Sequence, residues 1–270
     1  MASSTGYALG YAEAEKQRLV RQAVRFEPIL EAFLRDAGIR EGDRVLDVGS
    51  GLGDVSLTLG RLVTYRGAVL GLERDGASIG IARSRVAKIG MRNVTFVQAD
   101  VATFESDERF DAVVGRFILV FLPERVAVIR GLARLLRPGG VIAFQEPLRE
   151  ATQAINAHLP LQHACGTRLR DAFAQAGADT EIGGKVYALF QESGLRAPQL
   201  HCGAPIDGSD ELALYAYDLL VSVLRGTTNC GERTELDECE SLPRRLSAEM
   251  QAAKSCCAGP LVIGAWTQVP

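Results

Sequence analysis

The chain has 270 residues, of which 47% are hydrophobic and 23% are charged, as in a folded globular protein rather than a disordered one. Its formal net charge of −3 argues against the basic surface that a nucleic-acid partner would require. No apolar stretch approaches the roughly 20 residues that span a bilayer, and the polar N-terminus lacks the apolar segment of a signal peptide. We therefore expect a cytoplasmic protein without membrane insertion.

The first segment with helical spacing of apolar residues covers residues 8–37. Because proline lacks the amide hydrogen that the interior of an α-helix uses, Pro28 predicts a break between two helices. Tyr7, just before this segment, and Tyr11 and Gln22 within it are candidate ligand contacts, although core packing and surface exposure explain them as well.

The most informative stretch is Val45–Asp54, with the sequence V-L-D-V-G-S-G-L-G-D. Its apolar start predicts a buried parallel strand, which a glycine-rich turn joins to a helix. Gly49, Gly51 and Gly53 let the backbone turn tightly and come close to a ligand. The N-terminus of the following helix offers unpaired N–H groups to an anion.

The spacing of these glycines distinguishes between ligands. A dinucleotide site needs the pattern G-x-G-x-x-G/A, but Asp54 stands where the third small residue belongs. A carboxylate at that point would repel a pyrophosphate. A glycine-rich turn without any ligand is the other alternative, and it is disfavoured because further features follow in register.

The next apolar run, Val69–Asp75, carries a carboxylate close to its end. Glu73 lies about 20 residues beyond Gly53, where a doubly wound fold places the acid that holds a ribose. A solvated acid in a loop is the alternative for this residue.

Three further runs complete the series, at residues 94–101, 110–116 and 136–144. The first reaches Asp100, the second ends in Arg116, and the third begins with an R-P-G-G turn. Strands that alternate with helical segments in this way predict a parallel sheet with right-handed crossovers.

The order of these motifs over about residues 40–147 resembles the class I S-adenosylmethionine (SAM) methyltransferases. The resemblance implies a doubly wound α/β fold with a seven-stranded, mostly parallel sheet, whose last strand is antiparallel, and with helices on both faces. It also implies SAM as the cofactor. In this family the acid before the glycine loop attracts the cationic end of SAM, and the loop amides receive its carboxylate.

The resemblance assigns roles residue by residue. It places Glu73 on the ribose hydroxyls, Asp100 on the adenine amino group and the N–H of Val101 on a ring nitrogen. Arg116 would lie near the methionine part, with a structural salt bridge as the alternative. The full set expected around SAM is Asp47, Gly49, Ser50, Gly51, Gly53, Glu73, Arg74, Asp100, Val101 and Arg116.

We expect four parts along the chain. They are an N-terminal helical extension over the cofactor (1–40), the SAM-binding core (41–147), a helical lid (148–180) and the C-terminal part of the core with a helical insertion (181–270, insertion about 208–254). The last part should contain a helix at 182–195 and strands at 197–203 and 260–267. The insertion should contain helices at about 208–225 and 234–254.

Methyl transfer from a sulfonium requires alignment of the acceptor, and a base only where the acceptor must lose a proton. Glu146 follows the fifth run at the sheet edge and is a candidate base, with a helix cap as the alternative. His158 and His163 lie in the expected lid, and His163 is the second candidate, with a surface role as its alternative. The apolar residues of 208–225 either line a substrate chamber or, as core packing favours, seat a helix on the sheet.

Other chemistries are disfavoured. No D/N-P-P-Y/F/W motif stands at 115–118, which disfavours nucleobase methylation, and the six cysteines have no C-x-x-C spacing, so we expect reduced thiols and no metal. The sequence favours SAM-dependent methylation of a small organic acceptor, with an intermediate of secondary metabolism as one candidate. The rivals are a protein of this fold that steers a rearrangement or cyclisation, and an NAD or nucleotide-sugar enzyme with an unusual loop. The methylated atom and a homodimeric state are left open.

Overall fold

The computed structural model describes residues 13–227 and 241–270. The strands of its main sheet are β1 (Arg44–Val48), β2 (Ala68–Glu73), β3 (Val94–Gln98), β4 (Phe110–Arg116), β5 (Leu136–Leu148), β6 (Gln199–Gly203) and β9 (Leu261–Gln268). They form a seven-stranded sheet in the order β3-β2-β1-β4-β5-β9-β6. The first five pair in parallel, and β9 runs antiparallel to both β5 and β6. The predicted doubly wound fold is confirmed.

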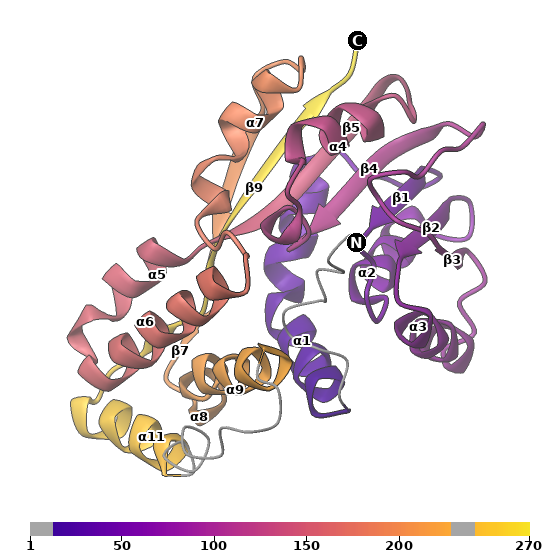
Figure 1. Ribbon diagram of the computed structural model, residues 1–270. Helices are drawn as coiled ribbons and strands as arrows, with labels where there is room; N and C mark the ends of the chain where they lie inside the picture. The colour runs from indigo at the N-terminus through magenta and orange to yellow at the C-terminus, as the bar shows by residue number, and fades with distance from the viewer. Residues whose placement is uncertain (1–12, 228–240) are drawn as a thin grey trace.

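Helices cover both faces of this sheet (Figure 1). They include α1 (Glu13–Asp36), α2 (Asp54–Val63), α3 (Gly76–Lys88), α4 (Arg125–Ala133) and α7 (Val186–Glu192). Val113 and Val114 are neighbours in β4 but belong to two different apolar clusters, because successive side chains of a strand point to opposite faces. The cluster of Val114 includes residues of α1, α2 and α3, and the cluster of Val113 includes residues of α4 and α7.

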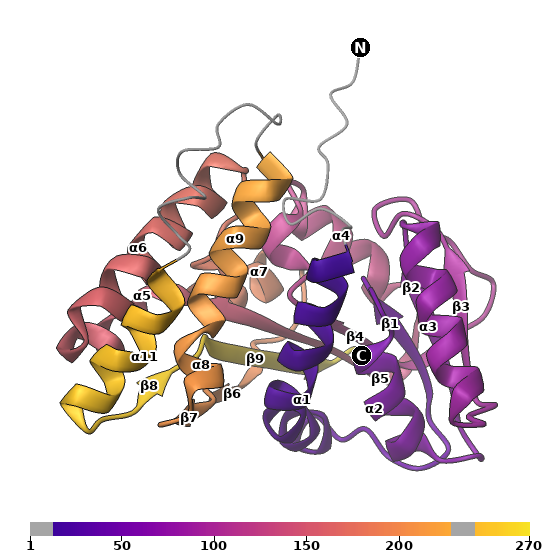
Figure 2. The ribbon, with the colours of Figure 1, turned by 90° about the horizontal axis from the view of Figure 1, so that it is seen from below.

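The N-terminal segment differs from the prediction. A single helix, α1, continues through Pro28, so the expected break into two helices does not occur. Phe26, Leu30 and Phe33 of α1 are buried, and this burial outweighs the one backbone hydrogen bond that a proline removes. Figure 2 shows part of α1 in the plane of the view and part end-on, so the helix bends along its length. Tyr7 and Tyr11 lie outside the described residues.

Five helices gather at the end of the sheet away from β3 (Figure 1), and we call them the cap helices. They are α5 (Arg149–Ile155), α6 (Pro160–Gln175), α8 (Asp210–Ala213), α9 (Tyr215–Thr227) and α11 (Leu242–Ala253). Helix α6 packs against α9, and α11 packs against α6 and α8. In Figure 2 they lie on one side of α1, whereas α2 and α3 lie on the other.

The cap helices are more divided than the sequence predicted. The helical lid expected at 148–180 splits into α5 and α6, with the 3₁₀ helix η2 (Asn156–His158) between them. The helix expected at 208–225 splits into α8 and α9, and the expected helix at 234–254 is described from Leu242 onward. Residues 234–240 lie outside the described residues. Two short strands that were not predicted, β7 (Ile206–Asp207) and β8 (Cys257–Ala258), pair beside this region.

The segment expected to form the last helix is confirmed. It contains the 3₁₀ helix η3 (Ile182–Gly184) and α7, after which Gly194 has a φ of 81°. The N–H of Leu195 donates to the carbonyl of Phe190 at 3.1 Å, as in a glycine C-cap. Strand β5 is longer than expected, so Glu146 lies inside the strand and not after it.

We predict that α1 is an integral part of the fold. The ring of Phe33 is 0% exposed and lies edge-on to Trp266 at 5.8 Å. Phe33→Ala should lower the free energy of unfolding in urea by about 3–5 kcal/mol. Val24→Ala, on the same helix but 69% exposed, should change it by less than about 0.5 kcal/mol. Equal effects of the two changes would contradict the packing of α1 described above.

Candidate active site

A cavity of about 560 Å³ lies at the carboxyl ends of the parallel strands. This is the edge where open α/β sheets bind their ligands, and the volume is typical of a small-molecule site. The predicted cofactor residues that line it are Gly49, Ser50, Gly51, Glu73, Arg74, Asp100, Val101 and Arg116. The structure thus brings together residues from the ends of four strands. The two others of the predicted set, Asp47 and Gly53, do not line the cavity.

The glycine loop packs against the protein at Gly49 and faces open space at Gly51. Gly49, Gly51 and Gly53 have φ values of 71°, 52° and 84°, in the left-handed region that favours glycine. A Cβ atom at Gly49 would lie 2.7 Å from the side chain of Ile118, whereas a Cβ at Gly51 would meet no atom within 4 Å. Gly53 is the N-cap of α2. The loop is therefore packed against its support at Gly49 and free to approach a ligand at Gly51.

Glu73 ties this loop to the end of β2. One carboxylate oxygen accepts the N–H of Gly51 at 3.0 Å, and the other accepts the N–H groups of Arg74 and Asp75 at 2.8 and 2.9 Å. Asp100, at the end of β3, is exposed, and it accepts the N–H of Ala102 at 2.8 Å. Both acids are thus held by local backbone groups at the cavity.

Asp47 lies buried beside the site. The hydroxyl of Ser56 donates to one carboxylate oxygen, and burial raises the pKa of Asp47 to about 7. The other oxygen, Oδ1, is buried without a hydrogen-bond partner in the described residues, and so are Ser50 Oγ and Arg116 Nη1. Buried polar atoms are normally paired. SAM carries an ammonium and a carboxylate, so these unpaired atoms, together with the open space at Gly51, fit it.

The turn after β4 is strained and held in place by Glu146. Phe117 has a φ of 55°, which is rare for a bulky residue. The carboxylate of Glu146 accepts the N–H groups of Ile118, Leu119 and Val120 at 3.0, 2.9 and 3.3 Å. Burial raises the pKa of Glu146 to about 8, while these three donors stabilise its ionised form.

Glu146 and the histidines stand apart from the cavity. Glu146 is 0% exposed and does not line it, so the geometry supports the alternative role, a cap for the 3₁₀ helix η1 (Leu119–Phe121). His163 is exposed on α6 and does not line it either. His158 is exposed and interacts with Ser255 at 2.8 Å. The predicted assignment of Glu146 and His163 as bases therefore has no support from their positions.

The helices contribute side chains that sequence reasoning left out or left open. Gln22, a candidate contact in α1, lines the cavity and accepts the hydroxyl of Tyr215 at 2.9 Å. Arg18 donates to Gln22 at 2.7 Å and pairs with Glu15 at 2.6 Å. Arg149, at the start of α5, is buried at the cavity. Arginines on amphipathic helices usually point into solvent, so the sequence did not indicate that Arg18 lines the cavity. For Arg149 the one indication was its place directly after a strand.

Helix α9 of the expected insertion packs in the apolar core and also lines the cavity. Leu220 and Val223 of α9 are buried in the apolar core, whereas Tyr215 and Leu219 also line the cavity.

Within residues 13–227 and 241–270, no cluster of His, Cys, Asp and Glu side chains is suited to a metal ion. In the same part of the chain no helix has the length and apolar character needed to cross a membrane. Cys202, Cys256 and Cys257 are free thiols, and Cys230 and Cys239 lie outside the described residues.

We predict that Glu146 is structural. Glu146→Gln replaces an acceptor oxygen with an NH₂ group that faces backbone donors, which should lower the free energy of unfolding by about 1–3 kcal/mol. Hydrogen exchange of the amides at 118–120 should become faster. Glu192→Gln, an exposed change at the end of α7, is the control and should alter neither quantity. Unchanged stability and exchange in Glu146→Gln would rule out the cap.

Part of this chain is similar to known methyltransferases. A family model described as a methyltransferase domain matches residues 39–194. A curated relative, the ubiquinone/menaquinone biosynthesis C-methyltransferase UbiE of Azotobacter vinelandii, is 35% identical over 116 residues. The match covers 41% of this chain and 46% of that protein, so the chain aligns with less than half of the length of this relative.

Solved structures share the fold at lower identity. The [4+2]-cyclase SpnF is 18% identical with a TM-score of 0.55, covering 90% of this chain and 80% of that one. The YcgJ protein of Bacillus subtilis is 18% identical with a TM-score of 0.53, covering 87% and 97%. The family model spans more than half of the chain, and the sheet order and the glycine loop agree with it. The chain therefore belongs to the methyltransferase domain family, as a class I S-adenosylmethionine-dependent methyltransferase.

Proposed function

We propose that this protein transfers a methyl group from SAM to a small organic acceptor that binds in the same cavity. The observation that carries the proposal is the continuity of the cavity. It extends from the glycine loop to an apolar part between α1, α6 and α9, lined by Phe117, Phe121, Phe173 and Leu219. SAM supplies a methyl group on a sulfonium, which is already a good leaving group.

The strand-end residues hold the cofactor in this proposal. Asp47 attracts the ammonium, the amides of the glycine loop and Arg116 face the methionine part, and Glu73 takes the ribose. Asp100 and the N–H of Val101 take the adenine. The roles of Asp47 and Arg116 are supported by their unpaired buried atoms. The role of Glu73 is supported by its place beside Gly51.

The acceptor side works by positioning and by exclusion of water. The described residues that line the cavity include no histidine and no cysteine. Burial raises the pKa of Tyr215, so its hydroxyl stays protonated at neutral pH and acts as a donor. We infer that the acceptor presents a nucleophile that needs no protein base, and that α1 and α9 align it with the methyl group.

The direct test is product formation with a panel of small acceptors. Release of S-adenosylhomocysteine that depends on an acceptor supports the proposal. Binding of SAM with isomerisation of a substrate but no S-adenosylhomocysteine would instead support a rearrangement or cyclisation. Oxidation of NAD(P)H without SAM binding would contradict both. A role in secondary metabolism, a homodimeric state and a cytoplasmic location remain predictions.

The open side of Gly51 gives a matched pair of variants. Gly42 has a φ of 88° and open space like Gly51, but it does not line the cavity. Gly51→Val and Gly42→Val should therefore lose similar stability from backbone strain. Calorimetry should show that only Gly51→Val loses S-adenosylhomocysteine binding, by at least about a hundredfold. Equal affinities in the two variants would remove the loop from the site.

Cofactor binding should depend on pH through Asp47. Its carboxyl is neutral below its pKa of about 7 and ionised above it, and only the ionised form attracts the ammonium. Affinity for S-adenosylhomocysteine should therefore rise with pH between about 5.5 and 7, by up to about tenfold per unit. Asp47→Asn should flatten this dependence. 5′-Methylthioadenosine, which lacks the amino acid, is the control ligand, and a matching rise in its affinity would contradict the assignment.

A further inference from the structure

Arg149 is a buried cation without a matching anion among the residues that the structure describes. It is the first residue of α5, directly after β5, and it is 6% exposed. Its Nε is buried with no hydrogen-bond partner, and no described carboxylate forms an ion pair with it. Its guanidinium lies over the ring of Phe173 at 5.6 Å. Because arginine stays charged in proteins, this arrangement costs stability unless a ligand supplies an anion.

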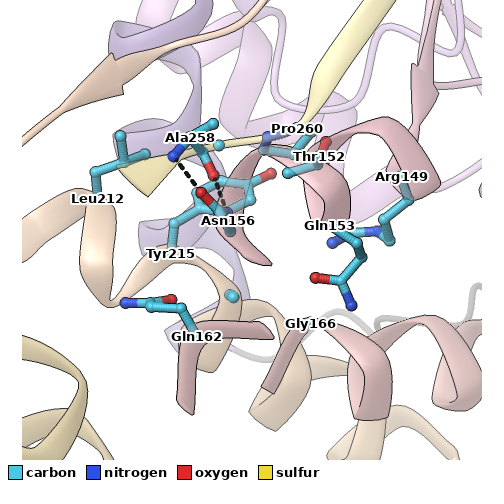
Figure 3. A pocket seen from close by; sticks show the side chains of 12 residues that line it. Arg149, Thr152, Gln153, Asn156, Gln162, Gly166, Leu212, Tyr215, Ala258 and Pro260 are labelled. Carbon is cyan, nitrogen blue, oxygen red and sulfur yellow. Dashed lines mark hydrogen bonds between the residues drawn. The ribbon is translucent and has the colours of Figure 1, made fainter. Parts of the chain in front are cut away.

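Arg149 stands where the main cavity meets a second, smaller pocket. This pocket has a volume of about 20 Å³ and shares Arg149, Tyr215 and Pro260 with the cavity. Figure 3 shows the guanidinium of Arg149 directed into it. The two spaces together therefore form one site with a small polar end.

The other polar side chains of the small pocket are already engaged. Gln153 donates to the carbonyl of His163 at 3.1 Å and to Thr167. Asn156 bonds both backbone groups of Ala258 at 2.8 Å (Figure 3). Gln162 donates to the carbonyl of Ala213 at 2.9 Å. Within the described lining of this pocket, Arg149 is the one charged side chain.

Nearby charges leave this end of the site positive. Glu181 acts on Arg149 at longer range, but its carboxylate accepts the N–H of Glu150 at 2.9 Å and the hydroxyl of Thr180. Glu15 is engaged by Arg18. An anion bound at Arg149 would therefore meet no competing carboxylate in hydrogen-bond contact with that side chain.

We propose that the acceptor carries an oxyanion, a carboxylate or a phosphate, which Arg149 binds where the main cavity meets the small pocket, while the rest of the acceptor occupies the apolar part of the cavity. This inference rests on the proposed function. The planar guanidinium matches either oxyanion in a bidentate manner. The aromatic side chains of Phe117 and Phe173 provide the surface for an apolar body.

The test is calorimetry on the full chain saturated with S-adenosylhomocysteine. The probes are benzoate, phenyl phosphate and the neutral isostere benzamide. The wild type should bind at least one anion about tenfold or more tightly than benzamide. Arg149→Met should abolish this preference and keep the affinity for S-adenosylhomocysteine within about twofold, whereas Arg149→Lys should retain part of the preference. The control is Arg170→Met, on an exposed arginine of α6 paired with Asp171, which should behave as the wild type.

A second measurement does not depend on the probe. Removal of an uncompensated buried charge should leave the melting temperature of ligand-free Arg149→Met unchanged or raise it by about 2–4 °C. A fall would assign Arg149 a structural role and overturn the proposal. Equal binding of benzamide and the anions, no binding of any probe, or an anion preference retained in Arg149→Met would overturn it as well.

The results distinguish a failure of the proposed acceptor site from a failure of the proposed function. A folded Arg149→Met that loses S-adenosylhomocysteine would assign this arginine to the cofactor and reject the acceptor site. Failure of the wild type to bind S-adenosylhomocysteine at all would contradict the proposed function itself. The tighter of the two anions identifies the oxyanion as carboxylate or phosphate.

Discussion

The site depends on one buried carboxylate that joins two neighbouring strands. Glu146 projects from β5 and accepts three successive N–H groups of the chain that leaves β4. This holds Phe117 in a left-handed conformation that a bulky residue rarely adopts. It also presents Ile118 to the glycine loop, where its side chain occupies the space that a Cβ at Gly49 would need. The conformations of two loops on adjacent strands are thus coupled through one residue that never reaches the cavity.

The cavity has two sides of different origin. Strand ends of the parallel sheet supply the side with the glycine loop, and the family model covers this part of the chain. On the opposite side, α1 and α9 lie outside the matched residues and contribute Arg18, Gln22 and Tyr215, whereas Arg149 and Phe173 lie within them. The acceptor contacts that we propose therefore come from both parts of the chain.

Several buried polar atoms at or beside this site are unpaired within the described part of the chain. Asp47 and Arg149 both have a buried atom without a hydrogen-bond partner there. Each costs stability in the empty protein, and each offers a charge at the place where a ligand of opposite charge would restore it. Burial of the two apolar clusters around the sheet stabilises the fold and offsets these costs.

The sequence by itself determined the sheet and the strand-end side of the cavity. Apolar runs separated by helical segments specify parallel strands, and topology then brings the ends of those strands to one edge, with Glu73, Asp100 and Arg116 among the residues there. Each of these placements could be predicted locally, because it depends only on where the residue lies relative to its own strand.

Tertiary structure decided what local patterns could not. Whether Pro28 broke a helix depended on burial against the sheet, and the role of Glu146 depended on the chain that leaves the neighbouring strand. The helical side of the cavity depends on contacts between distant segments, as between Gln22 and Tyr215, which are 193 residues apart in sequence. The function of such a side chain depends on the residue that it contacts. The periodicity and spacing of residues in a sequence do not show which helices pack against each other.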